Sequence, residues 1–115
     1  MRRGEIYIVD FEPVRGSDAA KRRPAVIVSN DGANLTATRL GRGVVTIVPV
    51  TSNTARVHPF QVLLPASETG LDRDSKAQAE QVRSIAVERV GARVGVVRSD
   101  MMNQIDEALR LHLAL

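Results

Sequence analysis

Apolar and polar residues alternate along several short stretches of this chain, which is the period expected of β-strands. A continuous run of β-branched residues, PAVIVS, predicts a strand buried on both faces. Another such run, VVTIV, gives the strongest strand pattern in the chain. The strands predicted in this way cover Glu5–Phe11, Pro24–Ser29, Val44–Val48, Phe60–Leu64 and Val94–Val97.

Polar segments with glycines and prolines separate these strands. Residues 13–23 combine turn formers with basic side chains and predict a long basic loop. Asn30-Asp31-Gly32 predicts a turn, a second polar loop ends at Gly41-Arg42-Gly43, and Pro49 marks a strand edge or a bulge. Long loops in small domains often carry function, so the basic loop is a candidate site.

Two segments have helical character. The residues from Ser75 to Val82 are good helix formers, and Ser75 with Gln78 forms a capping-box pattern, so local propensity favours a helix there. At the C-terminus, Ser99 or Asp100 can cap an amphipathic helix. Its apolar stripe comprises Met102, Ile105, Leu109 and Leu113. Because no βαβ rhythm appears, we expect a mainly β (α+β) fold: a small antiparallel barrel with a C-terminal helix.

Length and composition narrow the class of protein. The 115 residues fit one compact domain, expected to span residues 1–115. The absence of cysteine excludes disulfides, thiolate metal sites and cysteine nucleophiles. No segment has the ~20 apolar residues of a membrane span, and the N-terminus lacks a signal-peptide core. We therefore expect a soluble, cytoplasmic protein with no membrane association.

The basic residues are nearly all arginine. The formal net charge is +3, and Lys21 and Lys76 are the two lysines. Arginine binds phosphate through a planar fork, which suits nucleic acid, although a genome rich in arginine codons would give the same bias.

Few residues fit the common enzyme chemistries. His58 and His112 are the two histidines, too few for a metal hydrolase. Asp72 and Asp74 could hold a magnesium ion, but two carboxylates around an arginine in a turn more often act as local caps. The chain lacks the phosphate-loop, dinucleotide and nucleophile-elbow motifs. We expect no metal and no cofactor.

Two polar clusters remain at the ends of predicted strands, Lys21-Arg22-Arg23 and Thr51-Ser52-Asn53-Thr54. A barrel could bring them together, with guanidinium groups and hydroxyls facing one groove. An exposed charge run beside a polar turn accounts for the same residues from spacing alone.

Motifs along almost the whole chain resemble those of the MazF/PemK toxins. In order they are MRRGEIY (1–7), GS (16–17), RRPAVIVSN (22–30), PVTS (49–52), DS (74–75), EQVR (80–83) and the terminal helix. The resemblance implies a homodimeric SH3-like barrel and a toxin endoribonuclease that cuts single-stranded RNA at short sequences without a metal ion. It also implies a strand over Ser75–Val82, overriding the local helix propensity.

The same resemblance assigns candidate site residues. It makes Arg23 and Thr51 the catalytic pair. The candidate RNA-binding residues are Ser52, Gln81 and Arg83 in the groove, Ser17 and Asp18 in a gating or base-contacting loop, and Lys21 and Asn53 from the two polar clusters.

The chemistry needs no histidine, because RNA supplies the 2′-hydroxyl as nucleophile and the enzyme mainly fixes geometry and stabilises charge. Arg23 would stabilise the phosphate oxygens or donate a proton, Thr51 would donate a hydrogen bond, and the general base is left unassigned. The implied product is a 2′,3′-cyclic phosphate. The implied partners are single-stranded RNA, a second copy of the chain and an acidic MazE-like antitoxin.

Two alternatives stay open. A CcdB-like gyrase poison needs an aromatic end on the terminal helix, whereas this chain ends Leu-His-Leu-Ala-Leu. A non-catalytic RNA-binding barrel needs aromatic stacking platforms, and the three aromatic residues, Tyr7, Phe11 and Phe60, fall in strand-core register.

Overall fold

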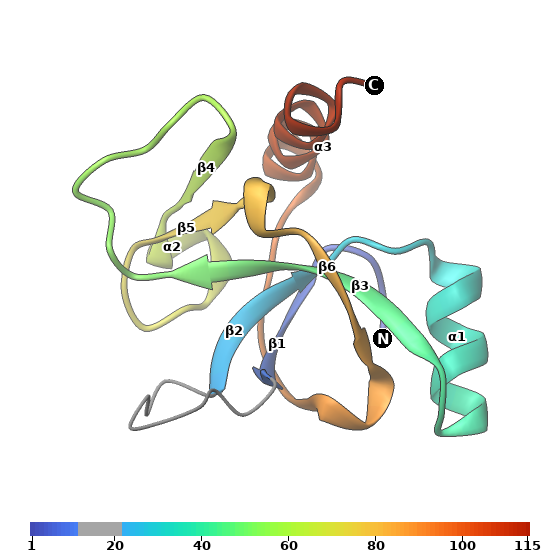
Figure 1. Ribbon diagram of the computed structural model, residues 1–115. Helices are drawn as coiled ribbons and strands as arrows, with labels where there is room; N and C mark the ends of the chain where they lie inside the picture. Colours follow the sequence, from blue (N-terminus) through green and yellow to red (C-terminus); the bar gives the residue numbers. More distant parts are fainter. Residues whose placement is uncertain (12–21) are drawn as a thin grey trace, which may run out of the picture.

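The computed structural model describes residues 1–11 and 22–115, whose strands form an antiparallel sheet (Figure 1). The strand order is β4-β5-β3-β2-β1-β7, and β6 also pairs with β3. Their bounds are β1 Glu5–Asp10, β2 Arg22–Ile27, β3 Val44–Thr51, β4 Gln61–Leu64, β5 Ser75–Gln78, β6 Arg83–Ala86 and β7 Val90–Val96. The predicted mainly β fold is confirmed.

The helices lie around this sheet, with α3 and α1 well apart in Figure 1. Their bounds are α1 Asp31–Leu40, α2 Ala66–Thr69 and α3 Ser99–Leu113, with 3₁₀ turns η1 Ala79–Gln81 and η2 Val87–Arg89. The predicted C-terminal helix is confirmed, although Leu113 of its stripe is 49% exposed and His112 is exposed as well. In the described part of the chain, no helix combines the length and apolar character needed to cross a membrane.

Apolar side chains collect in two clusters. The first joins the sheet to α3 and includes Ile6, Val26, Val50, Leu64 and Ile105. The second includes Val9, Ala25, Ile27, Ile47, Ile85 and, from α1, Ala37. Successive side chains of a strand point to opposite faces, so β2 supplies residues to both clusters. This confirms the prediction that β2 is buried on both faces.

Strand β3 changes partner along its length. Residues Val44 to Ile47 pair with β6, whereas Val50 and Thr51 pair with β5. Pro49 lies between these two pairings and opposite Ala25 of β2, so it does not mark the strand edge. The predicted end of the strand at Val48 is therefore wrong. As a result Thr51 is the last residue of a strand, not part of a loop.

The chain does not turn at Asn30 as predicted but enters helix α1. The Asn30 side chain accepts a hydrogen bond from the N–H of Ala33 at 2.8 Å, and Gly41 ends the helix with a positive φ of 65°. These are the standard N-cap and C-terminal glycine. The predicted polar loop before Gly43 is thus mostly helix.

The helix that local propensity favours over residues 75–82 is absent. Lys76 and Ala77 instead pair with both neighbouring strands, β3 and β4, and are buried. The strand implied by the family resemblance is confirmed for Ser75–Gln78, and the 3₁₀ turn η1 follows it. Pairing on both edges outweighs the intrinsic helix preference of these residues.

Helix α2 packs closely against strand β7 at a glycine. A Cβ atom on Gly95 would lie 2.4 Å from the carbonyl oxygen of Thr69, so a larger residue would require a backbone shift. Gly70, which follows Thr69 at the end of α2, has a φ of 85°, and its N–H donates to the carbonyl of Ala66. These contacts fix where the loop after α2 begins.

Candidate active site

Strand register brings the two predicted catalytic residues together. Ala25 of β2 lies opposite Pro49 of β3 in an antiparallel pair. The pairing ends there, and the same alignment continued by two residues would place Arg23 opposite Thr51. Directly opposed residues have Cβ atoms ~4.5–5.5 Å apart and project to the same face. The two side chains therefore start from neighbouring positions where β2 begins and β3 ends.

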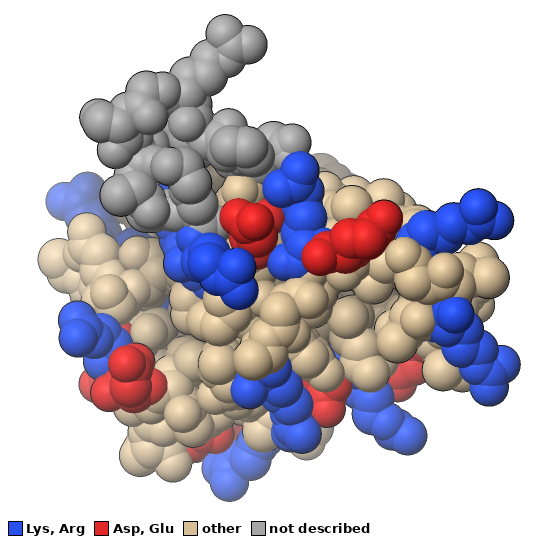
Figure 2. Space-filling model, turned by 90° about the horizontal axis from the view of Figure 1, so that it is seen from below, with Lys and Arg blue, Asp and Glu red and all other residues tan. Residues whose placement is uncertain are grey.

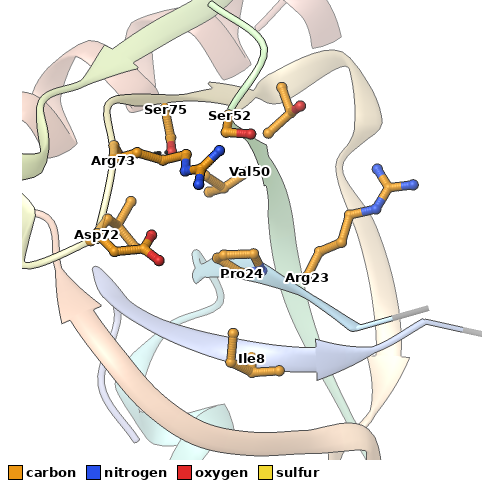
Figure 3. Close-up of a pocket in the computed structure, with 10 residues that line it drawn as sticks. Ile8, Arg23, Pro24, Val50, Ser52, Asp72, Arg73 and Ser75 are labelled. Carbon is orange, nitrogen blue, oxygen red and sulfur yellow. Dashed lines mark hydrogen bonds between the residues drawn. The ribbon is translucent and has the colours of Figure 1, made fainter. Parts of the chain in front are cut away.

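A cavity of about 470 Å³ opens at this point (Figure 3). Its apolar lining comes from Ile8, Pro24, Val50 and Leu71, and its polar lining from Arg23, Thr51, Ser52, Asp72, Arg73 and Ser75. In Figure 3, Arg23 lies on one side of the cavity, Asp72 and Arg73 on the other, and the side chain of Arg73 points toward Ser52. The cavity thus combines an apolar surface with two guanidinium groups, hydroxyls and one carboxylate.

The hydrogen bonds of the site leave its donors available. The Thr51 hydroxyl oxygen accepts a bond from the N–H of Asn53 at 3.3 Å, which leaves the hydroxyl proton free to donate. Thr51 is half-buried and Arg23 is exposed. Within residues 1–11 and 22–115, the Arg23 guanidinium has neither an ion pair nor a hydrogen bond. A phosphate entering the cavity would meet a charged fork and a hydroxyl donor.

Three polar residues that line the cavity, Asp72, Arg73 and Ser75, are not among the predicted site residues. Asp74 acts as the local cap expected of it, since its carboxylate accepts the N–H of Ala66 at 2.8 Å. Asp72 does not cap the turn but lines the cavity, and Arg73 lines it too. The signal in the sequence was a charged Asp-Arg pair directly before the DS motif.

The other predicted RNA-binding residues differ in their placement. Ser52 lines the cavity and Asn53 follows it on the exposed loop, whereas Gln81, although exposed, does not line the cavity. The Arg83 guanidinium lies over the ring of Phe11, 5.5 Å from its centroid, and Arg83 pairs with Ile47 on β3. The predicted positions Ser17, Asp18 and Lys21 lie outside the described residues.

Neither the histidines nor a metal cluster adds to this cavity. His58 stacks on Phe60 with ring centroids 5.1 Å apart, and it does not line the cavity. In the described ranges, no group of three or more His, Asp or Glu side chains is placed to share a metal ion.

Basic side chains spread widely over the lower face of the molecule. In Figure 2, lysines and arginines project around this face and acidic side chains lie between some of them, so the described surface there is mixed in charge. The local arrangement at the cavity therefore matters more for an anionic ligand than one continuous basic patch.

Comparison with known proteins is consistent with this geometry. The family model for "PemK-like, MazF-like toxin of type II toxin-antitoxin system" matches residues 2–113. Endoribonuclease MazF9 of Mycobacterium tuberculosis is 65% identical over 115 residues, covering 100% of this chain and 98% of that protein.

Solved structures share the fold. The M. tuberculosis toxin MazF-mt6 superposes with a TM-score of 0.76 at 21% identity, over 96% of this chain and 97% of the other. A mycobacterial endoribonuclease in complex with its cognate antitoxin gives a TM-score of 0.76 at 24% identity, over 100% and 96%. Since the family model spans nearly the whole chain and MazF9 matches it from end to end, this chain belongs to the PemK/MazF family of type II toxin–antitoxin toxins.

Proposed function

We propose that this toxin is a metal-independent endoribonuclease that cuts single-stranded RNA at the cavity lined by β2, β3 and the loop after α2. The observation that carries the proposal is that Arg23 of β2 and Thr51 of β3 line the same cavity. The name of the relative MazF9, an endoribonuclease, supports the same activity. We place the reaction in the cytoplasm, where messenger RNA is translated.

In the proposed reaction the 2′-oxygen of a ribose attacks the adjacent phosphorus, and the bond from phosphorus to the 5′-oxygen breaks. The 2′-oxygen loses a proton and the leaving 5′-oxygen gains one, giving a 2′,3′-cyclic phosphate and a 5′-hydroxyl. Negative charge grows on the phosphate oxygens as the new bond forms. Arg23 stabilises that charge through two N–H donors, and Thr51 donates one further hydrogen bond.

Mutation of the two residues tests the assignment. Arg23→Ala is expected to lower kcat/KM on a long single-stranded transcript by about 10²–10³-fold, because a preorganised charge donor is lost. Arg23→Lys should recover only part of the rate, since the fork is lost. Thr51→Ala should be impaired and Thr51→Ser should retain most activity, because the serine keeps the hydroxyl.

The matched control is Arg42→Ala. Arg42 is exposed and precedes the start of β3, at the end of that strand remote from Thr51. All assays contain EDTA, and the product ends are examined for a cyclic phosphate. Wild-type rates in folded Arg23→Ala and Thr51→Ala proteins would refute the assignment, while RNA binding without cleavage by the wild-type protein would favour the RNA-binding module.

We also propose two protein partners. A second copy of the chain would cover the exposed apolar side chains at the end of α3, which are Leu111, Leu113 and Leu115. An acidic antitoxin would bind near the guanidinium groups of the cavity, which agrees with the net charge of +3. The mycobacterial structure with its cognate antitoxin supports this second partner.

A further inference from the structure

The cavity adjoins a second compartment whose lining residues are mostly apolar. This compartment has a volume of about 340 Å³ and shares four lining residues with the main cavity. The shared residues are Ile8, Pro24, Leu71 and Asp72, and the compartment adds Gly70 and Val94. Among the residues that the structure describes, Asp72 is the one charged residue that lines it. A carboxylate at the edge of an apolar slot is suited to a flat ring that has hydrogen-bond donors on one side.

The loop that presents Asp72 is held in place from both sides. Leu71 is buried, and its N–H donates to the Thr69 hydroxyl. On the other side, Asp74 accepts the N–H of Ala66, and the Ser75 hydroxyl donates to the carbonyl of Arg73 at 3.1 Å. These contacts involve the side chains of Thr69, Asp74 and Ser75, and the side chains of Asp72 and Arg73 take no part in them.

Asp72 and Arg73 keep their binding capacity. In the described part of the chain neither side chain has a hydrogen bond or an ion pair, and both are exposed. Figure 3 shows both projecting into the cavity opposite Arg23. A fixed loop whose carboxylate and guanidinium have no partner among the described residues is suited to a ligand that carries both hydrogen-bond donors and negative charge.

We propose that the Asp72–Arg73 loop is the specificity-determining element of this toxin. Asp72 accepts a hydrogen bond from the exocyclic amino group of an RNA base seated in the apolar compartment, and Arg73 binds the backbone phosphate next to the one that is cut. The inference rests on the proposed RNA cleavage. It predicts that adenine, cytosine or guanine is preferred in the compartment over uracil, because uracil has a carbonyl oxygen where the other bases carry an exocyclic amino group.

A randomised pool of single-stranded RNA tests the role of Asp72, with the cut sites read for each protein. At one position near the cut, the wild-type protein should disfavour uracil by about tenfold or more, the scale of a lost base contact. Asp72→Asn should abolish that preference, since an amide offers both a donor and an acceptor, and should leave the other positions unchanged. Glu107→Gln, an acidic residue of α3 paired with Arg110, should keep the wild-type profile.

Binding gives a readout that does not depend on cleavage. RNA oligonucleotides methylated at every 2′-oxygen have no nucleophile, and pairs that differ in one base can be compared by fluorescence anisotropy. Arg73→Ala should weaken binding to all sequences alike and reduce the slope of log affinity against log salt concentration by about one. Arg42→Ala should change neither.

The outcomes separate the two proposals. If the wild-type protein cleaves RNA but Asp72→Asn retains its base profile, or Arg73→Ala retains its affinity and salt dependence, the inference is wrong and the proposed function stands. If the wild-type protein neither cleaves nor binds RNA, the proposed function is wrong and the inference with it.

Discussion

The Glu5 carboxylate contacts three residues, two near the N-terminus and one on β7. Glu5 accepts hydrogen bonds from the N–H of Arg2 at 2.7 Å and the hydroxyl of Tyr7 at 2.9 Å, and Arg93 of β7 lies 3.5 Å away. Burial by itself would raise the pKa of Glu5, but the two hydrogen bonds and the charge of Arg93 outweigh it and lower the pKa from 4.5. The charged form of Glu5 therefore stabilises the folded state.

The pKa of Glu5 leads to a pH-dependent prediction. Because its pKa is lower in the folded than in the unfolded protein, its contribution is complete above the unfolded value and is lost as the pH falls through the folded value. Glu5→Gln should lower the free energy of unfolding by about 1 kcal/mol at pH 7. In urea titrations the gap from wild type should narrow below pH 4.5. Glu88→Gln is the exposed control, and a gap that widened in acid would contradict the prediction.

The residue scale also shows what the sequence could provide about the site. Arg23 and Thr51 followed from the family motifs, and the antiparallel pairing of β2 with β3 gives the physical reason that both line one cavity. Arg73 did not follow, since its place opposite Arg23 depends on how the loop after α2 returns to the sheet. No local pattern encodes that return.

At the scale of elements, α1 is the clearest discrepancy between sequence and structure. Asn30 and Gly41 cap this helix, but the sequence analysis interpreted them as a turn and as the end of a polar loop, and the hydrophobic pattern between them does not indicate a helix. Leu35 and Leu40 are 51% and 60% exposed, whereas the buried residues of the helix are Asn34 and Ala37. An inward-facing side that consists of one amide and one methyl group gives no amphipathic signal.

That inward-facing amide should be important for stability. Asn34 is fully buried, donates to the carbonyl of Ser29 at 2.9 Å and accepts a bond from the Ser29 hydroxyl, which in turn accepts the N–H of Thr46 on β3. Asn34→Leu should lower the free energy of unfolding by about 1–3 kcal/mol, because buried polar partners lose their bonds. Chemical denaturation measures this.

Thr36→Ala is the control on the same helix, since its hydroxyl bonds to the carbonyl of Gly32 on the exposed side. It should change stability by no more than about 0.5 kcal/mol. Equal effects of the two substitutions would show that the Asn34 network does not anchor α1.

For the whole molecule, the surface at the end of α3 bears on assembly. Leu111, Leu113 and Leu115 are 58%, 49% and 83% exposed. If a second copy covers them, the wild-type protein should run as a dimer in size-exclusion chromatography with light scattering, and a Leu111→Glu, Leu113→Glu double variant should shift it to monomer. Leu40→Glu, at a leucine of α1 with 60% exposure, should stay dimeric. A monomeric wild-type protein at micromolar concentration would contradict the proposal.

The overall architecture was the most predictable property, because short strands, few helices and a terminal amphipathic segment allow few arrangements. The segment from residue 75 to 82 shows the limit. Its helix propensity is real, but β3 and β4 both pair with β5, and only the assembled sheet can supply those partners.

The close contact at Gly95 has a consequence for evolution within the toxin family. A methyl group at this position would have to move the Thr69 carbonyl by at least about 0.6 Å, from 2.4 Å to the 3.0 Å below which such atoms do not approach. Asp72 lies three residues after Thr69, in the loop that follows α2. Under the role proposed for Asp72, exchange of one hydrogen for a methyl group in β7 would alter the sequence preference of the toxin while leaving Arg23 and Thr51 in place.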